Sequence, residues 1–299
     1  MRMNVLVLGA NGMLGHRLIQ LLSHRFNVTG TVRGHARTYS GHHVLSQSAL
    51  LGNVQAENFD SVVNALAIAQ PAAVINCVGI VKQLPEAQDA LLTIAINALF
   101  PHQLAQLCRA AGARLIHIST DCVFSGRRGN YSESDVADAE DLYGRTKLLG
   151  EVSYDGCLTL RTSMIGRELG PSHGLVEWFL SQEGKAIHGY TRALFSGFTT
   201  HALAEIIAQI ITNHPDMQGV WHAASEPISK FDLLSLVKEI YGLNIRIEPD
   251  DTVETDRSLN ADRFRRATGL APPSWPDMVQ EMYGDPTPYS QIRRTYACQ

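Results

Sequence analysis

The first half of the chain alternates between two hydrophobic patterns. Continuous apolar runs of strand length, such as MNVLVLG at 3–9 and AAVINCVG at 72–79, are separated by segments whose apolar residues recur at helical spacing, such as NGMLGHRLIQLLSHR at 11–25. A strand that is apolar throughout is typical of a parallel sheet with both faces covered. The pattern therefore predicts strands that alternate with helices.

The same criteria extend the alternation to residue 162. Further strands are predicted at 26–33, 114–120 and 156–162, and helices at 57–70, at 85–112 with a bend near Pro101, and around 141–152. Because right-handed crossovers place helices on both faces, we predict an α/β fold, a doubly wound parallel sheet of the Rossmann type. Ligands of such sheets bind beyond the carboxyl ends of the strands, which here follow Gly9, Arg33, Gly79 and Thr120.

The pattern loosens beyond about residue 165. Helical and short strand segments follow one another, separated by proline and glycine, which indicates a smaller C-terminal α/β lobe folded against the sheet. We predict a dinucleotide-binding domain over 1–165, rejoined by about 196–223, and a mainly substrate-binding lobe over 166–299. The final segment, 288–299, has no clear period, so a disordered tail and a contact segment both remain open.

Composition narrows the class of protein. The 299 residues are 45% hydrophobic and 18% charged, which suits a soluble globular protein. A formal charge of −4 without a basic run argues against a nucleic-acid partner, and no apolar run approaches the roughly 20 residues of a membrane span, so we expect a cytoplasmic protein. The five cysteines form no C-x-x-C pair and the histidines no H-E-x-x-H motif, so neither a disulfide framework nor a metal site is predicted.

Residues 9–15 space three glycines as G-x-x-G-x-x-G directly after the first predicted strand. In a dinucleotide-binding turn, Gly9 permits the tight turn, Gly12 lets the backbone approach a pyrophosphate, and Gly15 lets the helix pack against the strand. The helix N-terminus adds N–H groups and a positive dipole. An ordinary tight turn is the alternative, but the position between a strand and a helix favours a cofactor loop.

The end of the second predicted strand carries Arg33 and no acid nearby. In dinucleotide-binding folds an acid there binds the ribose 2′-hydroxyl of NAD, whereas an arginine pairs with the 2′-phosphate of NADP. The sequence thus favours NADPH, with NADH possible, over a surface arginine without a role.

Tyr143 and Lys147 stand four positions apart on a predicted helix, so both side chains share one face. A phenol with a pKa of about 10 exchanges protons at neutral pH only when its anion is stabilised, and a nearby ammonium does this. The spacing alone is more typical of a half-buried tyrosine beside a snorkelling lysine. Ser119 and Thr120, however, end a buried strand, where a hydroxyl can bind a substrate carbonyl.

The glycine loop, the hydroxyl and the Tyr/Lys pair, in that order, resemble the extended form of the short-chain dehydrogenase/reductase superfamily, strongly over residues 4–165 and weakly beyond. The segments that look most like the dTDP-4-dehydrorhamnose reductase family of nucleotide-sugar 4-ketoreductases are NVLVLGANGMLG, VINCVGIVKQ, AINALFPHQLAQLCRAAGARLIHISTDCVFSG and YGRTKLLGE, and DRSLNADRFRRATGL is similar to that family's C-terminal segment. The resemblance implies NADPH-dependent reduction of the 4-keto group of a nucleotide-activated 6-deoxy sugar, a step of polysaccharide or glycoside biosynthesis.

The resemblance also implies residue roles. Tyr143 would give its proton to the 4-keto oxygen, Lys147 would bind the cofactor ribose and lower the tyrosine pKa, and Thr120 would hold the carbonyl. The cofactor would contact Gly9, Asn11, Gly12, Met13, Leu14, Gly15, Arg33, Asn53, Val54, Cys77, Val78, Gly79, Asn97, Tyr143 and Lys147, with a bracing role also open for Asn97. Substrate contacts are expected at Lys82, Val123, Phe124 and Arg192. Arg192 could pair with a substrate diphosphate through its bidentate guanidinium, and an ordinary edge residue is the alternative. A homodimer is left open.

Several positions depart from the family pattern. The family usually has an acid where Asn53 stands, a tryptophan at Met164, and an Asp-Gln-x-Gly-x-Pro-Thr segment where this chain reads YTRALFSGFTT, so the sugar and its nucleotide do not follow. Related dehydratases carry Thr-Asp-Glu where this chain has Thr120, Asp121 and Cys122, which makes a dehydratase the weaker hypothesis. For Asp121, an acid role and a turn-forming role both stay open.

Two further hypotheses remain from the sequence. One is a non-catalytic NADP-binding regulatory subunit, because the methionine adenosyltransferase beta subunit resembles the same family. The other is a reductase or epimerase of a different carbonyl substrate on the same scaffold.

Overall fold

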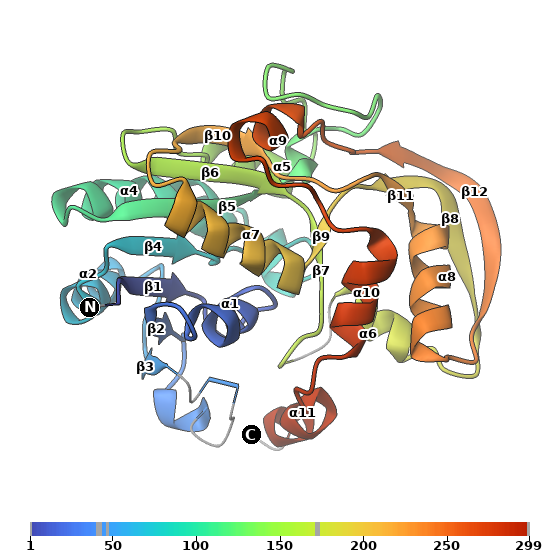
Figure 1. The fold of residues 1–299 in the computed structure, drawn as a ribbon, viewed down its shortest axis with the longest axis horizontal. Helices are drawn as coiled ribbons and strands as arrows, with labels where there is room; N and C mark the ends of the chain where they lie inside the picture. The colour runs from blue at the N-terminus through green and yellow to red at the C-terminus, as the bar shows by residue number, and fades with distance from the viewer. Residues whose placement is uncertain (1, 40–43, 46–47, 171–173, 298–299) are drawn as a thin grey trace.

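Seven parallel strands form the large sheet of the computed structural model, which describes residues 2–39, 44–45, 48–170 and 174–297 (Figure 1). They are β1 Asn4–Leu8, β2 Asn27–Thr31, β3 Ala49–Leu51, β4 Ala73–Asn76, β5 Arg114–Thr120, β6 Cys157–Thr162 and β10 Gly219–His222. Their order is β10-β6-β5-β4-β1-β2-β3. The chain runs from β1 to one edge, returns to β4 beside β1 and then proceeds to the other edge, so the predicted doubly wound Rossmann-type fold is confirmed.

Alternate side chains of β1 enter two separate hydrophobic cores. Val5 and Val7 belong to one core, and Leu6 and Leu8 belong to the other. Successive side chains of a strand point to opposite faces, so an apolar strand has to be covered on both sides. The helices that supply these covers are α1 Gly15–Leu22 and α7 Thr200–Asn213 on the first face, and α2 Phe59–Ala69 and α4 Phe100–Ala110 on the second.

The segment predicted as one bent helix contains a π-helical turn. It consists of a 3-10 turn Pro85–Gln88, α3 Ala90–Thr93, the π-helical turn Ile94–Leu99 and then α4. Pro101 lies in the first turn of α4 and has no N–H for the carbonyl of Asn97, which favours a local change in the helix. A Cβ on Gly150 would lie 1.9 Å from that carbonyl oxygen, so glycine lets α5 (Leu142–Leu149) pack closely there.

By length and composition alone, the helical segment Ala90–Ala110 is apolar enough to cross a membrane. The sequence expectation that no run approaches this length therefore needs correction. Half of its most apolar window is buried inside the fold, as in the core helix of a soluble protein.

The second half of the chain contributes to both parts of the molecule. α7 and β10 belong to the large sheet and its helical layer, whereas β8 Ala186–Phe195, β11 Ile228–Ser229 and β12 Arg246–Asp256 form a separate sheet in the order β11-β8-β12. A two-stranded ladder joins β7 Met164–Ile165 to β9 Phe198–Thr199. The remaining helices are α6 Leu175–Leu180, α8 Lys230–Tyr241, α9 Asp262–Thr268, α10 Trp275–Tyr283 and α11 Tyr289–Ala297.

Two elements lie where the sequence pattern assigned none. β3 adds an edge strand beside β2, and α11 forms within the tail that has no clear hydrophobic period. Tyr289 and Ile292 of α11 are buried in the first core, so the interpretation of the tail as a contact segment is confirmed for its described part.

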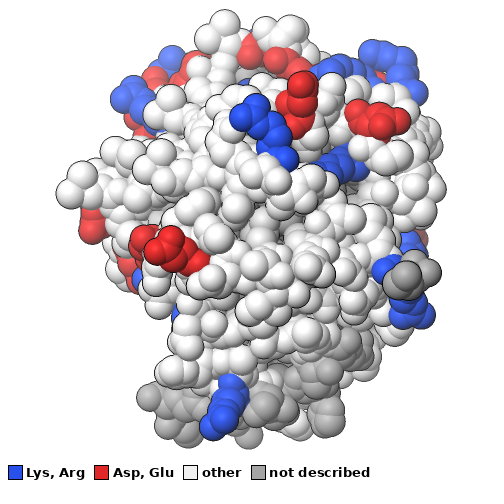
Figure 2. Space-filling view, turned by 90° about the vertical axis from the view of Figure 1, so that its left-hand side faces the viewer, with Lys and Arg blue, Asp and Glu red and all other residues white. Residues whose placement is uncertain are grey.

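Surface charges are mixed on the face shown in Figure 2. Lysines and arginines alternate there with aspartates and glutamates near its margins, and the described part of this face carries no continuous basic area.

Candidate active site

The helix α5 begins in a way that presents Tyr143 to the end of β5. The carboxylate of Asp141 accepts a hydrogen bond of 2.8 Å from the Gly144 amide and so caps the helix. A Cβ on Gly144 would lie 2.2 Å from the carbonyl oxygen of Cys122. Glycine is therefore required for this close packing, which brings Tyr143 beside Thr120.

Thr120 holds a hydrogen-bonded turn at the end of β5. Its hydroxyl accepts the N–H of Cys122 at 3.1 Å and donates to Asp121 Oδ1 at 3.1 Å, and its side chain lines one cleft with Tyr143. Burial raises the pKa of Tyr143 above its usual value, and the nearby Cys122 and Asp121 act in the same direction, while Thr120 opposes them. Tyr143 is thus protonated at neutral pH and can donate its proton.

Lys147 lies one turn further along α5, with its ammonium group buried. It donates to the carbonyl of Ile118 at 2.7 Å and lies 3.4 Å from Nε2 of His117. Burial lowers the pKa of Lys147 to about 8, against the influence of Glu151. Burial also holds the pKa of His117 well below its usual value. His117 was missed from the sequence because a histidine inside an apolar strand carries no distinct signal.

A cleft of about 530 Å³ opens above these residues, within the size range of small-molecule sites. Thr120, Tyr143 and Lys147 line it together with residues of the glycine loop. The lining residues predicted from the sequence are Gly12, Met13, Leu14, Gly15, Cys77, Val78, Gly79 and Lys82. The large sheet therefore brings segments from three strand ends and α5 to one cavity, as expected for a doubly wound fold.

The glycine loop has the shape that a pyrophosphate requires. Gly9 adopts a φ of 81°, which favours glycine, and a Cβ on Gly15 would lie 2.0 Å from the carbonyl oxygen of Gly9. Within the described chain, the amides of Met13 and Leu14 donate no hydrogen bond. These features leave backbone N–H groups available to an anion at the start of α1, so the loop fits a dinucleotide.

A second pocket of about 200 Å³ continues from the loop toward β2 and is lined by Gly9, Asn11, Arg33 and Val54. Arg33 is largely exposed and pairs with Glu57 at 2.9 Å. Glu57 lines the same pocket, so the sequence interpretation of Arg33 as free of nearby acids needs correction. This acid was missed because it follows β3, which the sequence pattern did not reveal.

Two predicted cofactor residues make contacts of a different kind. Asn53 does not line the pocket; it adopts a φ of 58°, which asparagine tolerates, and its side chain contacts His35. Asn97 is bound to the loop after β4, because its amide accepts from Ile80 N at 2.8 Å and donates to Ile80 O at 2.9 Å. The geometry of Asn97 is that of a brace.

Three predicted substrate residues lie outside the cleft. Val123 and Phe124 are fully buried, and Phe124 stacks on Tyr131, so we withdraw both from the candidate set as a correction. Arg192 is exposed on β8 and pairs with Glu254 at 2.6 Å. It is not among the residues that line the cleft.

Other cations face the cleft instead. Lys82 pairs with Asp141 at 2.6 Å and lies 5.6 Å from the centre of the Tyr143 ring. Lys230, at the start of α8, lies 4.2 Å from the centre of the Phe195 ring. Arg257 donates from Nε to the carbonyl of Phe124 at 3.0 Å and also lines the cleft. Lys230 had no signal in the sequence, because it belongs to the second half, whose topology the pattern did not predict. Arg257 lies in DRSLNADRFRRATGL, the segment similar to the family's C-terminal one, but nothing local in the sequence placed its side chain in the cleft.

Asp121 and Cys122 complete the floor of the cleft. Burial raises the pKa of Asp121, while hydrogen bonding from Thr120 and the charge of Lys230 oppose the shift. Burial raises the pKa of the Cys122 thiol to about 11, so it stays protonated near neutrality. Among the described residues, no cluster of three or more His, Cys, Asp or Glu side chains has the arrangement of a metal site.

A dinucleotide-binding sheet that brings a threonine, a tyrosine and a lysine together beside its glycine loop is the arrangement of the extended short-chain dehydrogenases/reductases. Comparison with known proteins narrows this class. The RmlD substrate binding domain family model matches residues 3–286. The dTDP-4-dehydrorhamnose reductase of Mycolicibacterium smegmatis is 33% identical over 252 residues, which cover 81% of this chain and 70% of that protein. The chain belongs to the dTDP-4-dehydrorhamnose reductase family.

Further comparisons extend this result. The Streptomyces griseus dTDP-4-dehydrorhamnose reductase is 37% identical to this chain over 148 residues. The match covers 49% of this chain, which spans 43% of the length of that protein. The methionine adenosyltransferase 2 subunit beta of Danio rerio is 26% identical over 80% of this chain and 74% of that protein. The structure of Bacillus anthracis dTDP-4-dehydrorhamnose reductase in complex with NADP has the same fold, with a TM-score of 0.79 and 20% identity over 95% of this chain and 99% of that one.

Proposed function

We propose that this protein uses NADPH to reduce the 4-keto group of a nucleotide-activated 6-deoxy sugar. The observation that carries the proposal is that Thr120, the protonated Tyr143 and the buried Lys147 line one cleft. Family membership supports the reaction class, and the two pockets joined at the glycine loop support a dinucleotide.

The cofactor would lie along the carboxyl edge of the sheet. The amides of Met13 and Leu14 would hold its pyrophosphate, Val54 would border the adenine, and Lys147 would hold the nicotinamide ribose. When bound, it supplies the hydride that the reduction needs. Arg33 would pair with a 2′-phosphate in place of its exposed contact with Glu57, which favours NADPH, and NADH remains a second donor.

The protein supplies the proton. The Thr120 hydroxyl would turn from Asp121 to the substrate carbonyl and hold it, and Tyr143 would donate its phenolic proton to the developing alkoxide. The positive form of Lys147 would stabilise the resulting phenolate. Thr120 and Lys147 are buried and Tyr143 is partly buried, which strengthens their electrostatic interactions.

The substrate diphosphate would bind at the opposite wall of the cleft. Lys230 and Arg257 line that wall and are closer to the chemistry than Arg192, which is paired on the surface. An arginine and a lysine directed into one cleft suit a diphosphate. We therefore transfer the proposed diphosphate contact from Arg192 to these two residues.

The test is turnover with a substrate panel. The purified protein would be incubated with NADPH and with dTDP-, GDP- and UDP-linked 4-keto-6-deoxy sugars, and loss of NADPH absorbance would be followed. We expect turnover with at least one nucleotide series. Tight NADPH binding without turnover on any of them would contradict the proposal.

That negative result would favour a second function. The methionine adenosyltransferase subunit among the relatives supports a regulatory, cofactor-binding role on the same fold. The discriminating observation is a change in the activity of a methionine adenosyltransferase catalytic subunit on addition of this protein. The complete set of Thr120, Tyr143 and Lys147 makes catalysis the better-supported function.

A further inference from the structure

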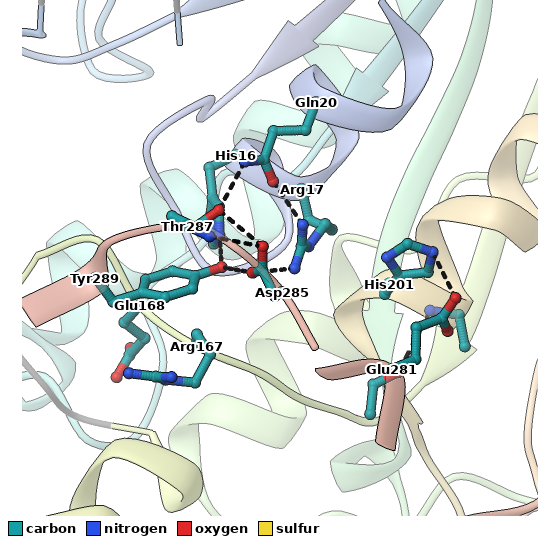
Figure 3. Close-up of polar contacts among 12 residues, drawn as sticks. His16, Arg17, Gln20, Arg167, Glu168, His201, Glu281, Asp285, Thr287 and Tyr289 are labelled. Carbon is teal, nitrogen blue, oxygen red and sulfur yellow. Dashed lines mark hydrogen bonds and ion pairs between the residues drawn. The ribbon is translucent and has the colours of Figure 1, made fainter. Parts of the chain in front are cut away.

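The C-terminal segment 285–293 contacts the start of α1 on one side and Arg167, Glu168 and Glu177 on the other (Figure 3). On the α1 side, the Tyr289 hydroxyl lies 3.0 Å from Nε2 of His16, and Asp285 forms an ion pair with Arg17. The His16 and Tyr289 positions are 273 residues apart in the sequence. Both side chains are buried, so this contact belongs to the core of the molecule.

His16 holds one carbonyl of the glycine loop. The Gly12 carbonyl accepts two hydrogen bonds from this residue, one from its backbone N–H at 3.1 Å and one from Nδ1 at 2.8 Å. In a trans peptide the C=O and N–H groups point in opposite directions. The Gly12 C=O and the Met13 N–H belong to the same peptide group. Because the carbonyl points at His16, the Met13 N–H points away from the helix and toward the cleft that Gly12 and Met13 line.

The partners of His16 fix its orientation and its tautomer. Burial lowers the pKa of His16 to about 4, so the imidazole is neutral and has one N–H, which the Gly12 carbonyl takes. Nε2 is then an acceptor and faces the Tyr289 hydroxyl. The Tyr289 hydroxyl donates its proton to Asp285 Oδ2 at 2.6 Å, and Arg17 neutralises that carboxylate. The Tyr289 oxygen therefore packs against Nε2 of His16 while it is anchored by Asp285.

On its other side, the C-terminal segment contacts residues that border the cleft. Arg293 donates to the Glu177 carboxylate at 2.5 Å and to the Glu168 carbonyl at 3.2 Å. The Arg167 guanidinium lies 4.6 Å from the centre of the Tyr289 ring and pairs with Glu177 at 2.6 Å. Glu168 lines the cleft, so the segment bridges the cofactor loop and the wall that faces it.

We propose that Tyr289 and Asp285 act through His16 as positioning residues for the cofactor, fixing the Gly12–Met13 peptide so that its N–H faces the pyrophosphate. The C-terminal segment thereby becomes part of the dinucleotide site. The inference rests on the cofactor part of the proposed function and is independent of the sugar and of turnover.

The test uses two substitutions that separate the contacts of His16. An asparagine amide reaches the position of Nδ1 and keeps the bond to Gly12, whereas a glutamine amide reaches the position of Nε2 and loses that bond. The variants are His16→Asn, His16→Gln and Tyr289→Phe in the full chain. His201→Asn is the matched control, because His201 pairs with Glu281 of α10 at 2.9 Å and touches no glycine of the loop (Figure 3).

The measurements are the dissociation constant of NADPH, from its fluorescence, and that of dTDP or UDP as a substrate-side probe. Loss of one buried hydrogen bond predicts NADPH binding weakened about fivefold to tenfold in His16→Gln and Tyr289→Phe. His16→Asn keeps the bond to Gly12 but loses the contact with Tyr289, so we expect its NADPH affinity to lie between those of His16→Gln and the wild type. Nucleoside diphosphate binding should stay within about twofold in all variants.

The inference is overturned if His16→Gln and Tyr289→Phe lower the melting temperature but bind NADPH like the wild type, or if His201→Asn weakens NADPH binding equally. Should His16→Gln fail to fold, Tyr289→Phe, which removes one hydroxyl, decides alone. A wild-type protein that binds no NADPH would overturn both this inference and the cofactor assignment. Because the test measures NADPH binding, it remains decisive even if the protein reduces no sugar in the panel.

Discussion

The amine nitrogen of Lys147 lies 3.4 Å from Nε2 of His117, and this contact fixes the protons of both groups. Oδ1 of Asn76 accepts a hydrogen bond from the Val78 N–H at 3.1 Å. The NH₂ group of the same amide therefore faces Nδ1 of His117, at 3.1 Å, and donates to it. A neutral imidazole that accepts at Nδ1 carries its proton on Nε2, which faces Lys147. This N–H and burial both disfavour the ammonium form, in agreement with a Lys147 pKa of about 8.

The first prediction concerns pH. Below about pH 8 Lys147 is charged and attracts the anionic cofactor, and above it the charge is lost, so NADPH affinity should fall as pH rises. Cofactor binding favours the charged form of Lys147 and therefore moves the midpoint of the pH dependence upward. We expect the NADPH dissociation constant to increase by about tenfold between pH 7 and 10. Lys147→Arg, which keeps its charge, should flatten the profile; affinity that improves with rising pH would contradict this role.

Removing the Lys147 side chain should affect both binding and chemistry. Lys147→Ala is expected to weaken NADPH binding by about tenfold and to lower kcat by a factor of about 100 or more, because the phenolate of Tyr143 loses its counter-charge. Lys185→Ala is the control, since Lys185 is exposed and its ammonium group donates to Gln182 at 3.4 Å. A variant with normal kcat would assign Lys147 a purely structural role.

Cofactor choice should depend on Arg33 and Glu57. Arg33→Ala is expected to raise the KM for NADPH by about tenfold and that for NADH by less than twofold, because only NADPH carries the 2′-phosphate. Glu57→Gln frees Arg33 from its exposed ion pair and should improve NADPH use by about twofold. Arg25→Ala, which breaks an exposed pair with Glu205, serves as control. Equal effects of Arg33→Ala on both cofactors would remove Arg33 from the site.

The diphosphate contact predicts an effect confined to the substrate. Lys230→Met is expected to raise the KM for the sugar nucleotide by about tenfold and to leave the KM for NADPH within about twofold. Lys238→Met, on the same helix but outside the cleft lining, should change neither value. If Arg192→Ala instead produces the substrate effect, the original placement of the diphosphate is restored.

Local signals in the sequence predicted the cofactor half of the site. Gly12 follows β1, Thr120 ends β5, and Tyr143 and Lys147 lie one turn apart on α5. In a parallel sheet the carboxyl ends of the strands converge at one edge, and all four residues line the cleft there. The strands could be recognised in the sequence as continuous apolar runs, because both of their faces are buried. The fold class therefore followed from the hydrophobic pattern and the glycine spacing together.

The substrate half depends on long-range packing that leaves no local pattern. Lys230 and Arg257 reach the cleft only because α8 and the end of β12 pack beside β8. The family resemblance implied a substrate contact for Phe124, yet its ring stacks on Tyr131 in the core. Glu57 was missed because the short β3 that precedes it lies in a polar stretch. The cytoplasmic location, the domain boundary near residue 165 and a homodimer stay predictions.

The most direct test of the central claim is Tyr143→Phe, which removes one oxygen and leaves the packing of the ring. Single-turnover reduction of the best 4-keto sugar nucleotide from the panel would be measured beside the NADPH dissociation constant. We predict a rate reduced by about 100-fold to 10,000-fold, with NADPH affinity within about twofold of the wild type. Turnover that persists at the wild-type rate in Tyr143→Phe would contradict the assignment of Tyr143 as the proton donor.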